Sequence, residues 1–253
     1  MLKETMYYYF SPTGGSKKAG EFFCNGIAQQ VHSVNLAAKA DIATDADCEF
    51  AVFTAPVYGG RIPSLEAEKL RKLNGTGKKA VTMAVYGTRA YEDALLELNT
   101  IVKECGFEII ASAAVIAQHS VVPAVGAGRP DEQDAESIRG FAEKVLEKLV
   151  QGAGSMEHIP GNYPYKPELN MPAAPISLEA CNQCGKCAAV CPADAVRVEN
   201  GAVITDVEKC MLCMACVYDC PKQARILPPP LQQKMDTMLE LFKTVRKENE
   251  YFI

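Results

Sequence analysis

Eight of the 11 cysteines of this 253-residue chain lie in one short stretch and follow a regular spacing. The first run reads Cys181-x2-Cys184-x2-Cys187-x3-Cys191-Pro192, and the second reads Cys210-x2-Cys213-x2-Cys216-x3-Cys220-Pro221. Each of these residues of the second run follows its counterpart by 29 positions, as Cys210 follows Cys181. The stretch is therefore an internal duplication that offers two sets of thiols, which bind soft metal ions and iron–sulfur clusters.

Two complete runs of this kind are typical of proteins that hold two [4Fe–4S] clusters. In such proteins, three cysteines of one run and the last cysteine of the other run hold the same cluster. The expected ligand sets are Cys181, Cys184, Cys187 and Cys220 for one cluster, and Cys210, Cys213, Cys216 and Cys191 for the other. Zinc is the alternative, but zinc sites use paired C-x2-C knuckles, which these runs fit poorly.

A second kind of chemistry is indicated by the segment Phe10-Ser11-Pro12-Thr13-Gly14-Gly15-Ser16, which opens a predicted helix. Hydroxyls and backbone N–H groups at a helix N-terminus bind phosphate and other anions. The candidate donors are the hydroxyls of Ser11, Thr13 and Ser16 and the backbone amides of Thr13, Gly14, Gly15 and Ser16. Pro12 brings no N–H, and an ordinary capped helix start is the alternative explanation.

Two further loops each contain tyrosine, glycine and one arginine, and each loop follows a predicted strand. The candidate ligand-binding residues are Pro56, Val57, Tyr58, Gly59, Gly60 and Arg61 in one loop, and Tyr86, Gly87, Thr88, Arg89 and Tyr91 in the other. An aromatic wall suits a flat ring, although strand-end packing would also explain the tyrosines. Arg61 and Arg89 are expected beside that ring, where they would favour an anion, unless they bind carboxylates of the protein itself.

These three loops need a scaffold, and residues 1–150 alternate strand and helix patterns. Strands are expected over residues 5–10, 31–36, 49–55, 79–86 and 107–117, and helices over residues 16–30, 64–73, 91–105 and 131–150. Apolar strands that alternate with helices predict a doubly wound α/β fold with a parallel sheet. Such sheets bind ligands at the carboxyl ends of their strands, where all three loops lie.

The rest of the chain divides into three segments. Residues 151–176 are a proline-rich linker that is expected to lie over the surface, and residues 177–227 contain the cysteine runs. Within this second segment, Asn200-Gly201 predicts the two-residue turn of a β-hairpin. Residues 228–253 are expected to form a C-terminal amphipathic helix that docks on the protein's own body, with a partner-binding helix as the alternative. The stripe on this helix comprises Leu231, Met235, Met238, Phe242 and Val245.

The composition indicates a globular protein, with 48% hydrophobic and 23% charged residues. A net charge of −5 argues against a nucleic-acid partner. The uncharged stretch 109–128 is interrupted by Gln118, His119, Ser120 and Pro123, which leaves too short an apolar run for a membrane span. Since no signal-peptide pattern is visible, we expect a cytoplasmic location, where clustered thiols bind metal more often than they form disulfides.

Three segments of the first domain read F-S-P-T-G-G-S, P-V-Y-G-G-R and Y-G-T-R-A-Y-E-D-A-L, and two cluster runs follow them. Together they resemble the flavodoxin–ferredoxin fusions called ferrodoxins. This resemblance covers most of the chain. It implies a five-stranded flavodoxin-like sheet of order 2-1-3-4-5, a small α+β ferredoxin domain, two [4Fe–4S] clusters and FMN. It also implies that the first loop holds the FMN phosphate, and that the loops of Tyr58 and Tyr86–Tyr91 hold the isoalloxazine ring.

The predicted function is electron transfer between the two clusters and FMN, for a redox partner protein or a small-molecule acceptor. One alternative is a flavin-dependent reductase of a small molecule, fed by the clusters. Another alternative is an iron–sulfur redox sensor. An electron carrier is favoured over a substrate-specific oxidoreductase because no general acid is visible beyond His119 and the tyrosines. His119 itself is explained either as a proton donor near the flavin or as a hydrogen-bonding residue of its loop.

Overall fold

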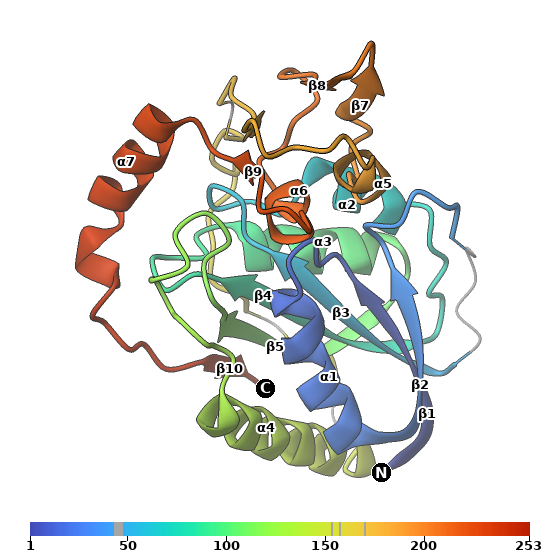
Figure 1. Cartoon of the computed structure of the whole chain (residues 1–253). Helices are drawn as coiled ribbons and strands as arrows, with labels where there is room; N and C mark the ends of the chain where they lie inside the picture. Colours follow the sequence, from blue (N-terminus) through green and yellow to red (C-terminus); the bar gives the residue numbers. More distant parts are fainter. Residues whose placement is uncertain (43–47, 153, 157, 170) are drawn as a thin grey trace.

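The computed structural model describes residues 1–42, 48–152, 154–156, 158–169 and 171–253. Five parallel strands form the centre of the first domain (Figure 1): β1 (Leu2–Tyr9), β2 (Ala28–Asn35), β3 (Phe50–Pro56), β4 (Lys79–Tyr86) and β5 (Glu108–Ile116). They are hydrogen-bonded in the order β2-β1-β3-β4-β5. This is the doubly wound, flavodoxin-like order that the sequence predicts, and each expected strand forms with its ends shifted by three residues or fewer.

Two layers of helices cover the sheet. Helices α1 (Gly15–Ile27) and α4 (Glu132–Val150) pack on one face, and α2 (Ser64–Leu70) and α3 (Ala94–Glu104) pack on the other. Successive strand residues point to opposite faces, so Tyr7 of β1 joins the core under α1 and its neighbour Tyr8 joins the core under α3. This sandwich fixes the carboxyl ends of β1, β3, β4 and β5 along one edge.

The C-terminal segment differs from the expected single helix over residues 228–253. Helix α7 (Pro229–Met238) and the short 3-10 helix η1 (Glu240–Phe242) are followed by strand β10 (Glu250–Phe252). Strand β10 pairs antiparallel with β5 and extends the sheet to six strands. Without β10, the outer edge of β5 would leave its backbone N–H and C=O groups unpaired. The ring of Tyr251 also stacks on that of Phe141, with 4.7 Å between the ring centroids. The prediction of a helix to the end of this segment is therefore wrong.

The apolar stripe of the C-terminal segment docks on the protein's own body, as predicted, but only in part. Met235 and Phe242 pack against the buried cluster of Val122, Val125 and Leu239. Met238 and Val245 of the same stripe are exposed. Among the described residues, no helix has both the length and the apolar character needed to cross a membrane.

The linker lies over the α/β domain rather than extending from it. The backbone N–H of Asn162 donates to Asp93 Oδ1, and that of Lys166 donates to Asp93 Oδ2, both at 2.8 Å. The cysteine-rich domain then follows with six short elements: β6 (Ile176–Ser177), α5 (Lys186–Ala189), β7 (Val196–Glu199), β8 (Ala202–Thr205), α6 (Ala215–Tyr218) and β9 (Arg225–Ile226). Strand β6 pairs with β9, and β7 pairs with β8 through the predicted turn, in which Asn200 and Gly201 both have positive φ.

Candidate functional site

The eight clustered thiols line two separate cavities in the cysteine-rich domain. The first cavity is lined by Cys181, Cys184, Cys187 and Cys220, and the second by Cys191, Cys210, Cys213 and Cys216. Each cavity therefore combines three cysteines of one run with the last cysteine of the other run. This grouping matches the crossed ligand sets that the spacing predicts.

The duplication in the sequence is repeated in the backbone. Helix α5 follows Cys184 as α6 follows Cys213, and each of these short helices begins after a residue in the left-handed region. The residues with positive φ form three pairs that are 29 positions apart: Gln183 and Leu212, Gly185 and Met214, and Asp194 and Gln223. Both halves thus have the same sharp turns, which bend each run of cysteines around its cavity.

Backbone N–H groups point at the thiols in both halves. Ala195 N donates to Cys191 Sγ at 3.3 Å, and Ala224 N donates to Cys220 Sγ at 3.2 Å. Burial raises the pKa of the Cys213 thiol to about 12, so this ligand becomes a thiolate only when a bound metal stabilises it. Two cavities with four thiols each and N–H···S contacts fit a pair of iron–sulfur clusters.

The loop before α1 carries the hydroxyls that the sequence predicts to bind an anion. Ser11 Oγ accepts a hydrogen bond from Lys17 N at 3.0 Å, so this hydroxyl satisfies one backbone N–H of the first turn of α1. Gly14 has a φ of 90°, which allows the sharp entry into α1. In the part of the chain that the structure describes, the hydroxyls of Thr13 and Ser16 have no hydrogen-bond partner. These two hydroxyls therefore remain wholly available to a ligand, whereas the Ser11 hydroxyl already accepts one hydrogen bond and keeps its own O–H to donate.

A cavity of about 60 Å³ lies between this loop and the ends of β3, β4 and β5. Its lining unites residues of four segments: Ser11, Pro12, Thr13, Gly15, Ser16, Pro56, Val57, Tyr58, Val85, Tyr86, Gly87, Ala117, Gln118, His119 and Ser120. Nine of the residues predicted to bind FMN belong to this lining. Val85, Ala117 and Gln118 were not predicted, although Ala117 and Gln118 lie beside His119 and Ser120, which the sequence places after the fifth strand on the same edge.

The two arginines predicted beside the ring bind carboxylates of the protein instead. Arg61 pairs with Glu97, and Arg89 Nη2 lies 2.7 Å from Glu92 Oε1. Neither arginine lines the cavity. The expectation that both guanidinium groups flank a bound ring is therefore corrected, and the alternative explanation for them holds.

The remaining predicted residues also lie outside this cavity. Tyr91 packs against Tyr86 and donates its hydroxyl to Glu250 Oε2 at 2.9 Å. Thr88, with a φ of 63°, is 1% exposed, and its Oγ1 is buried without a partner among the described residues. Side chains crowd the two glycines. A Cβ at Gly59 would meet Leu169 of the linker, and one at Gly60 would meet Glu92 and Lys166 of the linker.

His119 forms one wall of the cavity and is held by its own loop. Its Nδ1 accepts hydrogen bonds from Val121 N at 3.2 Å and from Val122 N at 3.1 Å. The ring therefore carries its proton on Nε2. Burial, together with the charge of Arg89, lowers the pKa of His119 to about 4, so the ring is neutral at pH 7. Of the two explanations for His119, the structure thus shows the hydrogen bonds within its own loop.

Tyr58 connects the α/β domain with the cysteine-rich domain. It lines the cavity of about 60 Å³ and also a second cavity of about 440 Å³ that reaches Cys210, Met211 and Leu212. Met211 packs against the core under α3. On the other side of the contact, Gln118 Nε2 donates to the hydroxyl of Tyr218 at 3.4 Å. The second run of cysteines thus lies against the edge of the sheet that carries the predicted flavin loops.

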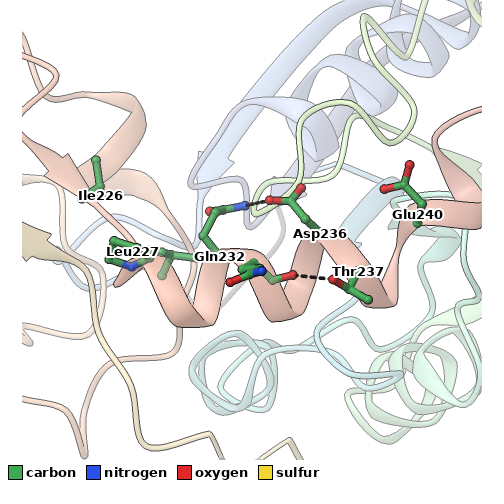
Figure 2. A pocket seen from close by; sticks show the side chains of 8 residues that line it. Ile226, Leu227, Gln232, Asp236, Thr237 and Glu240 are labelled. Carbon is green, nitrogen blue, oxygen red and sulfur yellow. Dashed lines mark hydrogen bonds between the residues drawn. The ribbon is translucent and has the colours of Figure 1, made fainter.

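A further cavity of about 540 Å³ runs along α7 (Figure 2). Gln232 Nε2 donates to Asp236 Oδ2 at 3.2 Å within its wall. Its lining contains no cysteine and no residue of the three predicted loops. We therefore assign no part of the chemistry to this groove.

Comparison with known families supports the iron–sulfur assignment independently of the cavities. Residues 174–221 match the family model described as a 4Fe-4S dicluster domain, and this segment includes all eight clustered cysteines. The chain therefore contains a 4Fe-4S dicluster domain joined to a flavodoxin-like α/β domain.

Curated relatives share the cysteine-rich part of the chain. One subunit of the Na⁺-translocating ferredoxin:NAD⁺ oxidoreductase complex of Acetobacterium woodii is 35% identical over 99 residues, which is 36% of this chain and 29% of the relative. One subunit of an ion-translocating oxidoreductase complex of Methanosarcina acetivorans is 48% identical over 44 residues, 17% of each chain. The chain thus spans less than a third of the length of the curated relatives that it matches.

Solved structures resemble the first domain. A short-chain flavodoxin associated with a PDU bacterial microcompartment has a TM-score of 0.44 and 19% identity, covering 58% of this chain and 99% of that chain. A Fusobacterium nucleatum flavodoxin bound to flavin mononucleotide has a TM-score of 0.44 and 12% identity, with the same coverage. At such low similarity, the fold assignment rests on the strand order β2-β1-β3-β4-β5 itself.

Proposed function

We propose that this protein transfers electrons between two [4Fe–4S] clusters and one FMN held in the same chain. The observation that carries this proposal is the place of Tyr58, which lines both the cavity at the predicted flavin loops and the cavity that reaches Cys210. The two sets of four thiols support the cluster part of the proposal. The open hydroxyls of Thr13 and Ser16 support the phosphate part.

The residues that would hold FMN come from the loops at the sheet edge. Thr13 and Ser16 would donate their hydroxyls to the phosphate at the start of α1. Val57, Tyr58 and Tyr86 would form the apolar walls for the ring. The cavity of about 60 Å³ is small beside ligand pockets of roughly 300–1,000 Å³, so these walls have to separate when a ring enters. When bound, FMN supplies a carrier of one or two electrons, and the protein supplies its position and surroundings.

The two clusters would have different tasks in this arrangement. The cavity of Cys210, Cys213 and Cys216 would hold the inner cluster, since Tyr58 and Met211 join this run to the α/β domain. The other cavity includes Cys184, which is exposed, whereas Cys213 and Cys216 are buried. An external redox partner would therefore exchange electrons at the side of Cys184, and the inner cluster would connect it with the flavin.

A cofactor analysis tests this proposal directly. Iron, acid-labile sulfide and flavin are measured on one anaerobic sample of the reconstituted full chain, together with its visible spectrum. We expect about eight irons for two [4Fe–4S] clusters, and one FMN per chain. A chain that takes up iron but binds no FMN would overturn the proposed transfer between the two kinds of cofactor.

Reduction of a small molecule is a second candidate, because of the cavity of about 440 Å³ beside Tyr58. Arg61, Ser64 and Lys209 give this cavity a polar lining. A small acceptor bound there would lie between Tyr58 and the second cysteine run. Steady-state oxidation of the reduced protein by small acceptors, compared with oxidation by an electron-carrier protein, distinguishes the two functions. Saturation by a small acceptor, lost when Lys209 is replaced by Glu, would favour the reductase.

A further inference from the structure

Arg225 is a buried cation of the cysteine-rich domain that has no carboxylate partner. It lies on β9 and is 2% exposed. Its Nη1 donates to Ser177 Oγ at 3.0 Å and its Nη2 donates to Thr205 Oγ1 at 2.8 Å, both of which are neutral. Among the described residues, no carboxylate lies within ion-pair distance of it, and its Nε is buried without a partner.

The guanidinium lies between the two sets of thiols. Arg225 lines the cavity of Cys181, Cys184, Cys187 and Cys220. At the same time its Nη2 lies 3.9 Å from Sγ of Cys216, which belongs to the other cavity. One positive charge is thus shared by both sites.

A buried and unpaired cation is strongly unfavourable unless an anion compensates its charge. A [4Fe–4S] cluster with four thiolates is a net anion, and reduction adds one further negative charge, so nearby charges and hydrogen bonds set its potential. The anion that Arg225 lacks in the protein is therefore supplied by the groups that the two cavities would bind.

We infer that Arg225 is a shared counter-cation for both clusters, which raises both reduction potentials and reduces the repulsion between the two reduced clusters. This inference rests on the proposed binding of two clusters. Arg225 acts through its charge and does not transfer the electron itself, so it is a positioning and tuning residue.

The duplication makes this charge a specific feature of the second half. Arg225 corresponds to Val196 of the first half, by the same 29 positions that relate Cys181 to Cys210. Val196 is buried on β7 and brings no charge. The two halves share their cysteines, the prolines after them and the pair Ala195 and Ala224, but only the second half has a cation at this position.

The test is a redox titration of the full chain with both clusters loaded, followed by electron paramagnetic resonance under anaerobic conditions. In Arg225→Gln, we expect both midpoint potentials to fall by at least 59 mV, which for one electron is a tenfold change in the reduction equilibrium. Arg225→Lys keeps the charge and should recover most of the shift. Arg197→Gln is the matched control, because Arg197 is an exposed arginine of the same domain, paired with Glu199, and its loss should leave both potentials unchanged.

Unchanged potentials in Arg225→Gln would overturn the inference, and a shift of one cluster alone would overturn the shared role. If Arg225→Gln loses iron, Arg225→Met replaces it, since this change removes the charge and keeps a long side chain in the buried position. A fall of both potentials in this variant supports the inference, and unchanged potentials overturn it. Fewer than eight irons in the wild-type chain would instead contradict the proposed function, which keeps the two failures distinct.

Discussion

Arg61, in the loop that follows β3, and Glu97 of α3 form a largely buried ion pair. Arg61 Nη2 lies 2.5 Å from Glu97 Oε1, and Arg61 Nε donates to Oε2 at 2.8 Å. The two side chains are 14% and 6% exposed. Arg61 Nη1 also donates to the carbonyl oxygen of Lys166 at 2.8 Å. One residue thus joins the loop of Tyr58 to α3 and to the linker.

The first prediction concerns the stability that this pair provides. Arg61→Gln leaves the carboxylate of Glu97 buried without its cation, and such a loss lowers the free energy of unfolding by about 3–5 kcal/mol. Equilibrium urea unfolding followed by circular dichroism measures it. Arg61→Met with Glu97→Gln removes both charges and should recover part of the loss. Equal stability of the wild type and Arg61→Gln would contradict this account of the pair.

The carboxylate partners of Arg61 and Arg89 were not predictable from the sequence. The partner of Arg61 is 36 residues away on α3, so only the packed fold brings the two together. The cluster thiols were predictable, because their spacing is local and occurs twice. The five parallel strands were predictable from their apolar runs. Strand β10 was not, since its three residues carry too short a pattern and its pairing depends on the free edge of β5.

The second prediction concerns the crossed ligand sets. Cys191→Ala should remove the cluster held mainly by Cys210, Cys213 and Cys216, although Cys191 belongs to the other run, and Cys220→Ala should remove the first cluster. Electron paramagnetic resonance and iron analysis of each variant separate the two losses. The two variants serve as controls for each other, because their positions are related by the duplication. Loss of the cluster in the same run as the replaced cysteine would contradict the crossing.

The third prediction concerns the loop before α1. Thr13→Val with Ser16→Ala should weaken FMN binding tenfold or more, because each lost hydrogen bond to a charged phosphate contributes roughly 1.5–3 kcal/mol. Fluorescence titration with FMN and with riboflavin gives the two affinities. Riboflavin has no phosphate, so its affinity should stay the same.

Ser11→Ala is the control for this loop. Ser11 Oγ accepts from Lys17 N, so its loss should affect the start of α1 and weaken FMN binding less than the double variant does. If the wild-type chain binds riboflavin as tightly as FMN, the loop is not a phosphate site.

The fourth prediction concerns pH and His119. Its pKa of about 4 in the folded protein lies below the ordinary value of about 6.5 in the unfolded chain. The unfolded chain therefore binds a proton first as the pH falls, and stability is lost between about pH 6.5 and pH 4. At pH 5 this loss amounts to about 2 kcal/mol relative to pH 8.

His119→Asn isolates this contribution, because the amide oxygen can accept the loop hydrogen bonds and does not titrate. The difference in unfolding free energy between pH 8 and pH 5 should be smaller in this variant than in the wild type. An identical pH dependence of the two proteins would mean that His119 titrates normally in the folded state.

The iron–sulfur domain is attached to the flavodoxin-like domain at both of its ends. Before it, the linker is held by Asp93 and Arg61, and after it the chain returns to the sheet as β10. A domain on a single flexible tether samples a large volume, and its effective concentration near a partner site falls with tether length. Two anchors hold the domain over one edge of the sheet, so the cofactors would meet at a fixed spacing, independent of protein concentration. If the proposed function holds, the chain would act as a preassembled complex of two carriers that would otherwise have to find each other by diffusion.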